Sequence, residues 1–284
     1  MADLSPPPLA HLDEQVARAL AEDLGAAGDI TTNATIPATK TASAVIAARK
    51  PGVLAGLPVA VRVFHTVDPR LVLVPKVQDG TRLSPGDVIL EVSGAARSIL
   101  KAERVALNFL GHLSGIATAT ADIAQAIAHT KTKVCDTRKT TPGLRLLEKY
   151  AVRCGGGINH RIGLYDMVLI KDNHIAAAGG IKPAIAAAKA AAPKGVIIEV
   201  EVDTLAQLDE VLSVGADRIL LDNMTPALLK EAVARVAGRA VTEASGSITK
   251  TTAPAIADAG VDLMSAGWIT HSAPSLDLGL DFKA

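Results

Sequence analysis

Arg138 and Lys139 stand side by side in the stretch VCDTRKTTPG, residues 134–143. Arginine offers a planar fork of donors to a carboxylate or phosphate, and lysine offers a compact positive charge. Two adjacent cations repel one another unless an anion lies between them. The stretch therefore predicts an anion-binding site, and a solvated basic turn is the alternative. Thr137 adds a hydroxyl donor beside the two cations.

A second group of cations follows a triple glycine at residues 155–157. His160 and Arg161 lie in GGGINHRIG, where glycine would let the backbone approach a ligand closely, although such a run also ends helices. Lys171 ends the apolar run MVLIK. An ammonium there is expected to be partly desolvated, which would lower its pKa. Lys171 is thus a candidate anion ligand or Schiff-base nucleophile, or else an ordinary lysine that extends to solvent.

Carboxylates follow later in the chain. Glu199 and Glu201 alternate in EVEV, so both face one side of a strand, and Asp222 ends the next apolar run. Carboxylates that point into a protein interior need a partner or a metal ion. Glu201 and Asp222 are predicted to hold Mg²⁺, directly or through water, together with substrate oxygens. The alternative is salt bridging to Lys139 and Lys171.

Two loops of small residues complete the candidate set. EASGSIT contains Ser245, Gly246 and Ser247, and SAGWITHS contains Ala266, Gly267 and Trp268. Backbone N–H groups in such loops bind phosphate, and β/α barrels often bind phosphate at their last two strand loops. A tight turn that needs glycine for geometry alone is the alternative.

The elements that must position these residues form a regular series. From residue 131 onward, six apolar β-like segments alternate with helical patterns: TKVCD, MVLIK, VIIEVEV, RILLD, AVTEA and DLMSAG. Such alternation predicts a parallel sheet, here an open, incomplete α/β barrel, whose strand carboxyl ends meet at one face. The residues at those ends are Arg138, Lys139, Lys171, Glu201, Asp222, Ser245, Gly246 and Gly267. Pro142 is expected to begin the helix after the first strand, with Thr141 as its cap.

The first part of the chain reads differently. LDEQVARALAEDLG has helical spacing, and three short β-like runs follow before a long helix that we expect to begin at Glu103. The predicted domains are residues 1–110 (an α/β domain), residues 111–270 (the barrel) and a C-terminal tail, residues 271–284, that returns to the first domain. The run DGTRLSPGDV resembles half of a biotinyl or lipoyl carrier. It lacks the Met-Lys-Met tip, so a scaffold is expected.

Composition excludes several classes. Lysine and arginine (29) balance aspartate and glutamate (29), which argues against a nucleic-acid or membrane-surface binder. Residues 131–174 carry nine basic and four acidic residues, whereas residues 195–284 carry six and thirteen. This asymmetry suits a site for anions and a metal, although folding could intermix the two segments. Two cysteines without metal or redox spacing, and an N-terminal segment without signal-peptide features, predict a cytoplasmic protein.

At this point the motifs resemble a known family. DTRKTTPGLRLLEKYAVRCGGGINHRIGLYDMVLIKDNH, with ERVALNFLGHLSGIAT before it and EVEVD, LLDN, EASGSI and THS after it, closely resembles quinolinate phosphoribosyltransferases. DITT at residues 29–32 also matches, and the resemblance covers nearly the whole chain. Where the family usually has glycine, this chain has Ser247, whose side chain would either crowd the phosphate-binding loop or add a hydroxyl donor.

The resemblance implies a reaction. The family transfers phosphoribose from phosphoribosyl pyrophosphate to the pyridine nitrogen of quinolinate. Nicotinate mononucleotide, pyrophosphate and CO₂ result, in de novo NAD synthesis. The family needs Mg²⁺, and no organic cofactor is expected. It has an N-terminal hammerhead-like α/β domain and an open α/β barrel. Its homodimers, some assembling further, place one subunit's N-terminal domain over the partner's barrel mouth.

The resemblance also assigns residues. Quinolinate is expected to meet Thr137, Arg138, His160, Arg161 and Lys171, with Arg104 supplied by the neighbouring subunit. Phosphoribosyl pyrophosphate is expected to meet Lys139, Glu201, Asp222 and the two small-residue loops. Lys139, Lys171, Glu201 and Asp222 are the predicted catalytic residues. A paralogous transferase acting on another pyridine or base, or less favoured a Schiff-base lyase that uses Lys171, remains the alternative.

Overall fold

The structure, a computed structural model, describes residues 4–283 and divides into two compact units. Of the described residues, unit 1 comprises 4–121, 141–156 and 272–283, and unit 2 comprises 122–140 and 157–271. Among residues 4–283, no helix is both long and apolar enough to cross a bilayer. The expected class, an α/β N-terminal domain with a parallel-strand α/β sheet after it, is confirmed.

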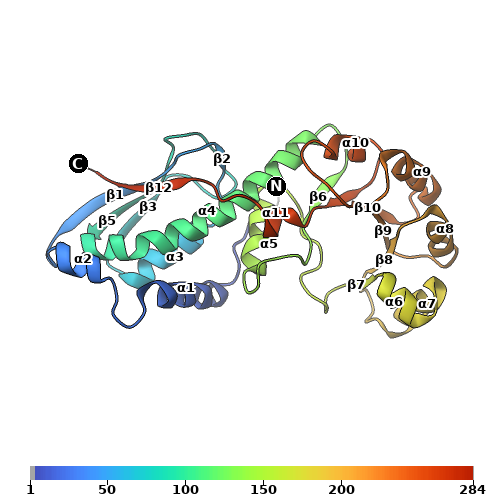
Figure 1. The fold of residues 1–284 in the computed structure, drawn as a ribbon, viewed down its shortest axis with the longest axis horizontal. Coiled ribbons are helices and arrows are strands. Elements are labelled where there is room, and N and C mark those ends of the chain that lie inside the picture. Colours follow the sequence, from blue (N-terminus) through green and yellow to red (C-terminus); the bar gives the residue numbers. More distant parts are fainter. Residues whose placement is uncertain (1–3, 284) are drawn as a thin grey trace. The chain divides into compact units, whose positions relative to one another are not determined.

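Unit 1 is built on an antiparallel sheet of four strands in the order β12-β1-β5-β3, shown on the left of Figure 1. The strands are β1 (Thr41–Ala48), β3 (Val72–Pro75), β5 (Val88–Ala95) and β12 (Leu278–Phe282). In β1, Ala44 and Ile46 are buried whereas Ser43 and Val45 are not, as expected for a strand with one covered face; Ala47 and Ala48 at its end are both buried. A small second sheet pairs β2 (Gly52–Val53) with β4 (Arg82–Leu83).

The helices of unit 1 supply most of its core. They are α1 (Leu9–Leu24), α2 (Ile30–Thr35), α3 (Leu57–Val67), α4 (Ala96–Ala126, which continues into unit 2) and α5 (Arg145–Cys154). The DITT segment begins α2, because the Asp29 side chain accepts the N–H of Thr32 at 2.8 Å. α4 begins at Ala96, not at Glu103 as expected. Ile99 and Ala102, both fully buried, extend its apolar stripe toward the amino end.

The start of α5 was also predicted wrongly. Gly143 has φ +83°, a left-handed conformation that interrupts a right-handed helix. Pro142 therefore lies in a turn, closed by a hydrogen bond from the Leu144 N–H to the Thr141 carbonyl, and α5 begins at Arg145. Thr141 does not cap this helix through its side chain; its N–H donates to the buried Glu148 carboxylate.

The C-terminal strand is held in unit 1 by a close backbone approach. β12 pairs antiparallel with β1 from Ala44–Phe282 to Ala48–Leu278. Just before it, the Leu276 N–H donates to the Gly111 carbonyl of α4 at 2.9 Å. A Cβ on Gly115, one turn further along α4, would lie 2.2 Å from the Pro274 oxygen, so only glycine fits there.

Unit 2 contains one parallel sheet of six strands in the order β6-β11-β10-β9-β8-β7. These are β6 (Lys133–Cys135), β7 (Val168–Ile170), β8 (Ile198–Val202), β9 (Arg218–Asp222), β10 (Val241–Ser245) and β11 (Leu263–Ser265). All six expected strands are present. Because β6 and β7 each have one strand neighbour, the sheet does not close into a barrel.

Helices connect these strands and line one side of the sheet (Figure 1, right). They are α6 (Asp172–Ala178), α7 (Ile181–Ala191), α8 (Leu205–Val214), α9 (Pro226–Val236) and α10 (Ala253–Ala257); the short helix α11 (Trp268–His271) follows the last strand of the sheet, β11. Thr204 and Thr225 cap α8 and α9 through their side chains. The alanine-rich segment between β7 and β8 forms two helices, α6 and α7, separated by Gly179 and Gly180, which both have positive φ. The linking helices bring every strand's carboxyl end to one edge of the sheet.

Candidate active site

A cavity of about 410 Å³ opens at the carboxyl ends of the unit 2 strands. It brings together residues from across that unit, and its lining is Thr137, Arg138, Lys139, His160, Arg161, Leu169, Lys171, Glu201, Leu220, Asp222, Glu243, Ser245 and Ser265. Four of the lining side chains are arginines or lysines, and three are carboxylic acids. A cavity of mixed charge in which cations predominate is suited to an anionic ligand.

Within the VCDTRKTTPG stretch, residues 137–140 form a tight turn just after the carboxyl end of β6. The Thr137 hydroxyl accepts the Lys139 N–H at 3.0 Å, and the Thr140 N–H donates to the Arg138 carbonyl at 3.0 Å. The Thr270 hydroxyl also donates to the Lys139 carbonyl at 2.7 Å. The backbone of this turn is therefore fixed by three hydrogen bonds. Its two cationic side chains both line the cavity.

Arg161 approaches the cavity from the segment after the triple glycine. Its guanidinium donates to the Met167 carbonyl at 3.2 Å. Burial lowers the pKa of Arg161, and the positive charge of the nearby Arg138 lowers it further. Two arginines so close and partly buried create a position where one anion, or two linked anionic groups, would be stabilised.

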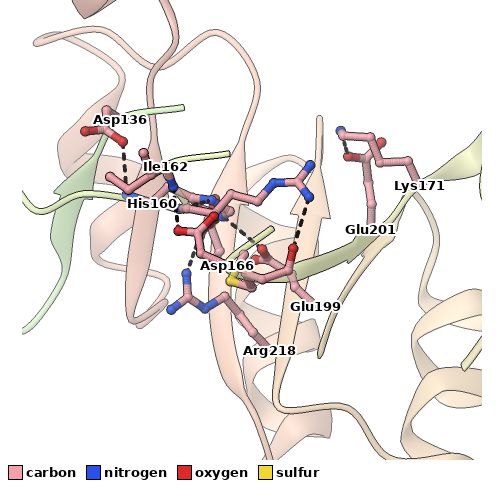
Figure 2. A network of polar contacts seen from close by, with 11 residues as sticks. Asp136, His160, Ile162, Asp166, Lys171, Glu199, Glu201 and Arg218 are labelled. Carbon is pink, nitrogen blue, oxygen red and sulfur yellow. Dashed lines mark hydrogen bonds and ion pairs between the residues drawn. The ribbon is translucent and has the colours of Figure 1, made fainter. Parts of the chain in front are cut away.

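Lys171 and Glu201 form an ion pair across the ends of β7 and β8 (Figure 2). The Lys171 side chain is 43% exposed, so the desolvation expected at this position is not present. The reason is its place in the sheet, because β7 is an edge strand that pairs only with β8 among the described strands. An exposed, ion-paired ammonium is suited to binding an anion and lacks the apolar pocket that activates a Schiff-base lysine.

His160 is held in a buried acidic network beneath the cavity (Figure 2). Its Nε2 lies 2.8 Å from Glu199 and 3.5 Å from Glu243, and its Nδ1 accepts the Arg161 N–H at 2.8 Å. With Nδ1 accepting, the ring proton is on Nε2 and is donated to Glu199. His160 thus borders the cavity while its two ring nitrogens bond within the protein.

This network also contains potential metal ligands. One ligand atom each from His160, Glu199 and Glu243 lies within 4.8 Å of the others. The guanidinium of Arg218, however, lies 3.4 Å from Glu243. A fixed positive charge at that distance disfavours a metal cation among these three side chains. Glu201 and Asp222, near the carboxyl ends of the neighbouring strands β8 and β9, are more accessible oxygen ligands because both are partly exposed and line the cavity. A metal ion there would displace Lys171 from its ion pair with Glu201.

A second cavity, of about 380 Å³, adjoins the first through shared residues and is formed by the small-residue loops. Ser245, Gly246, Ser247, Ala266, Gly267 and Trp268 all line it, together with Lys139 and Asp222. The Trp268 indole N–H donates to the Ile248 carbonyl at 2.7 Å, which ties one loop to the other. Ser247 adopts φ +50°, a left-handed conformation that favours glycine.

Comparison with known proteins identifies the family. Residues 29–114 match the model of the quinolinate phosphoribosyl transferase N-terminal domain, and residues 116–281 match that of its C-terminal domain. The chain belongs to the quinolinate phosphoribosyltransferase family. It is accordingly an enzyme, a phosphoribosyltransferase, and the resemblance read from its motifs is confirmed.

Individual relatives of this phosphoribosyltransferase agree. It is 48% identical over 274 residues to a nicotinate-nucleotide pyrophosphorylase [carboxylating] of Mycobacterium leprae, covering 94% of this chain and 96% of the relative. A probable enzyme of the same name from Bacillus subtilis is 45% identical, with 92% and 89% covered. The crystal structure of NadC from Streptococcus pyogenes, 45% identical, superposes with a TM-score of 0.93 over 99% of this chain and 100% of that one.

The left-handed glycine of the loop at residues 245–247 gives a testable prediction. Gly246 has φ +101°, and a Cβ there would lie 2.2 Å from the Asn223 side-chain oxygen. Gly246→Ala is therefore expected to destabilise the transferase by about 1–3 kcal/mol through strain and displacement of Asn223, and to weaken phosphoribosyl pyrophosphate binding. Gly195→Ala is the matched control, because Gly195 has φ +87° with nothing within 4 Å. Equal effects of the two substitutions on binding and unfolding would contradict the steric argument.

The buried glutamates predict a stability that falls as pH rises. Burial raises the pKa of Glu199 to about 7, and it raises that of Glu243 to about 7 with the help of the Glu199 charge. An unfolded glutamate titrates near pH 4.3, so the folded enzyme holds more protons between about pH 4.3 and 7. This stabilisation is complete below that window and is lost as pH rises through about 7.

Glu243→Gln tests the direction of this effect. Removing the titrating acid is expected to flatten the stability profile by on the order of 1–3 kcal/mol between pH 5 and pH 8. Urea unfolding at the two pH values measures it. A variant whose unfolding free energy falls with pH as steeply as that of the unaltered enzyme would show that Glu243 is not the source.

The residues predicted from the sequence and the residues that line the two cavities are not the same set. Arg104 is exposed on α4 and lines neither cavity. Glu243 and Ser265, which line the first cavity, and Arg218, which contacts Glu243, were not among the predicted site residues. Glu243 stands two residues before Ser245 in β10, so the alternation that singled out Glu199 and Glu201 would have found it. Nothing comparable in the sequence indicates Arg218, which enters at the start of β9.

Proposed function

We propose that this protein transfers phosphoribose from phosphoribosyl pyrophosphate to the nitrogen of quinolinate, in a Mg²⁺-dependent reaction that releases pyrophosphate and CO₂. Nicotinate mononucleotide, a precursor of NAD, is the product. The observation that carries the proposal is the pair of adjoining cavities in a chain of this family. One is lined by four cations, and the other is lined by two small-residue loops.

The first cavity is the proposed quinolinate site. Arg138 and Arg161, close enough to repel one another, would each meet a carboxylate of the dicarboxylic acid. Lys171 and the Thr137 hydroxyl would add donors. His160, whose ring nitrogens bond to Glu199 and the Arg161 N–H, would form part of the wall. Arg104 of the partner subunit would complete the site.

The second cavity is the proposed site of the 5′-phosphate. Backbone N–H groups and hydroxyls at residues 245–247 and 266–268 suit a phosphate. Lys139 lines both cavities and would face the pyrophosphate between them. Glu201 and Asp222 would bind the ribose hydroxyls. Ser247 in place of glycine would add a hydroxyl donor to the loop. A residue with a side chain is strained in the left-handed conformation that Ser247 adopts.

In the proposed reaction, the protein would act mainly by stabilising developing charges, and no covalent bond to a side chain is required. Departure of pyrophosphate leaves positive charge on the ribose C1′, which Glu201 and Asp222 would stabilise, while Lys139 and Lys171 stabilise the leaving group. Holding the pyridine nitrogen opposite the departing pyrophosphate would supply the remaining rate enhancement through proximity and orientation. Once that nitrogen is quaternary, the ring stabilises the carbanion left when the neighbouring carboxylate departs as CO₂. No organic cofactor is required.

A Mg²⁺ ion fits the same carboxylates. Glu201 and Asp222 are partly exposed oxygen ligands that line the first cavity beside the proposed pyrophosphate position. The ion would supply Lewis-acid stabilisation of the pyrophosphate. Removing it with a chelator is expected to lower the rate of pyrophosphate release at least about a hundredfold, and added Mg²⁺ is expected to restore it. Full activity in excess chelator would contradict Mg²⁺ dependence.

Assembly and location are part of the proposal. We expect a homodimer, able to assemble further, in which residues 1–110 of one subunit cover the partner's site. The catalytic domain would be residues 111–270, and the tail would be residues 271–284. A cytoplasmic enzyme without nucleic-acid or membrane partners is expected, since its charges balance and both proposed substrates are small molecules.

One assay tests the reaction and its alternative. Pyrophosphate release is measured with quinolinate, nicotinate and nicotinamide in parallel, each with phosphoribosyl pyrophosphate and Mg²⁺. Release with quinolinate alone supports the proposal. Release with another pyridine but none with quinolinate would make the protein a paralogous transferase.

A further inference from the structure

A buried carboxylate lies directly before the two cations of the VCDTRKTTPG turn. Asp136 is fully buried, and both of its oxygens bond to the segment after the triple glycine. One oxygen accepts the His160 N–H at 2.9 Å, and the other accepts the Asn159 side-chain amide at 2.5 Å. Figure 2 shows the first of these bonds. We call Asp136, Asn159 and the His160 N–H the Asp136 clamp.

The clamp joins two parts of the chain that are more than twenty residues apart. Backbone bonding supports it: the Ile158 N–H donates to the Val134 carbonyl at 2.9 Å, and the Asp136 N–H donates to the Ile158 carbonyl at 3.3 Å. Residue 158 thus adds an isolated parallel bridge beside Cys135 at the end of β6. Side-chain and backbone bonds together fix the two segments side by side.

Each segment carries one arginine of the cavity just beyond the clamp. Arg138 follows Asp136 by two residues, and Arg161 follows His160 directly. Burial lowers the pKa of Arg161, and the Arg138 charge lowers it further, so the two positive charges oppose one another. Glu199 and Asp166 offset part of this repulsion, and the remainder favours moving the two segments apart. The bonds of the clamp resist that movement.

We propose that Asp136 is a positioning residue: the Asp136 clamp sets the separation of Arg138 and Arg161 so that they bind two carboxylates on adjacent ring atoms. This inference rests on the proposed function. It adds a structural reason why the enzyme would prefer a pyridine dicarboxylate to a pyridine monocarboxylate. Held at a fixed separation, the pair recognises a pyridine dicarboxylate with little reorganisation. A pyridine monocarboxylate offers the pair only one carboxylate for two positive charges, so it binds weakly.

The test compares binding of two ligands in Asp136→Ala. Isothermal calorimetry is run with quinolinate and, separately, with phosphoribosyl pyrophosphate. The alanine leaves the His160 N–H and the Asn159 amide without their carboxylate, so quinolinate affinity is expected to fall about tenfold or more, while phosphoribosyl pyrophosphate affinity stays within about threefold. The preference for quinolinate over nicotinate is expected to shrink as well. Asp136→Asn, which keeps an acceptor for the His160 N–H, is expected to recover most of the affinity.

Controls separate this role from general damage to unit 2. Asp262 also joins two segments, accepting the Thr242 N–H and hydroxyl at 2.9 and 2.8 Å, but at the amino end of β10. Asp262→Ala should lower stability without a selective loss of quinolinate affinity. If Asp136→Ala does not fold, Asn159→Ala removes one clamp bond and should weaken quinolinate binding alone, about threefold to tenfold.

The outcomes are distinguishable. Unchanged quinolinate affinity in the clamp variants, or equal losses for both ligands, would overturn the clamp. Failure of the unaltered protein to bind quinolinate would instead overturn the proposed function.

Discussion

Replacing Arg161 or Arg138 with alanine is expected to weaken quinolinate binding by about 2–4 kcal/mol, because each substitution removes a two-bond arginine–carboxylate interaction from a partly buried site. Phosphoribosyl pyrophosphate binding should change much less, because its proposed contacts lie at Lys139 and the small-residue loops. Calorimetry with each ligand measures both effects. Removing one arginine also relieves its repulsion with the other, which reduces the loss of affinity but does not cancel it.

Arg239→Ala serves as the control for the removal of a cation from unit 2. Its guanidinium donates to backbone carbonyls at the end of α9, in an exposed position before the start of β10. That variant should bind both ligands as the unaltered protein does. Quinolinate affinity that survives both Arg138→Ala and Arg161→Ala would mean that the dicarboxylate binds elsewhere.

Mixing two inactive variants is expected to restore activity if sites are shared between subunits. Arg104→Ala and Lys171→Ala should each abolish turnover on their own. In a mixed dimer, the subunit with an intact Lys171 receives an intact Arg104 from its partner, so one of two sites works. With random exchange, half of the dimers are mixed, and about a quarter of the original activity should return.

The size of the recovery is diagnostic. The rate of pyrophosphate release is measured after the variants are co-folded or co-expressed with different tags and the mixed dimer is isolated. An isolated mixed dimer should recover half of the sites. A verified mixed dimer with no activity would contradict the contribution of Arg104 of the partner subunit.

Much of unit 2 could be predicted because the alternation of apolar runs and helices in its sequence largely determines its topology. Short apolar runs that alternate with amphipathic helices allow few arrangements other than a parallel sheet, and strand carboxyl ends must then share an edge. Arg138, Lys171, Glu201 and Asp222 could be grouped for that reason. They do line one cavity, although they are spread over more than eighty residues of sequence.

The remaining details depend on tertiary context that one sequence does not display. Lys171 is exposed because β7 is an edge strand, and strand order is not readable from alternation alone. Pro142 is compatible with the first turn of a helix, but Gly143 adopts a left-handed conformation, so the helix begins only at Arg145. The pairing of His160 with Glu199, and of Asp136 with Asn159, joins residues on different segments. No local pattern distinguishes such buried pairs from solvated charges.

The measurement that tests the account most directly is the product balance with quinolinate. The purified protein is incubated with quinolinate labelled in its 2-carboxylate, phosphoribosyl pyrophosphate and Mg²⁺. Nicotinate mononucleotide, pyrophosphate and labelled CO₂ should appear in equal amounts. A nucleotide that retains the label, or no nucleotide from quinolinate alongside product from nicotinate, would contradict the account.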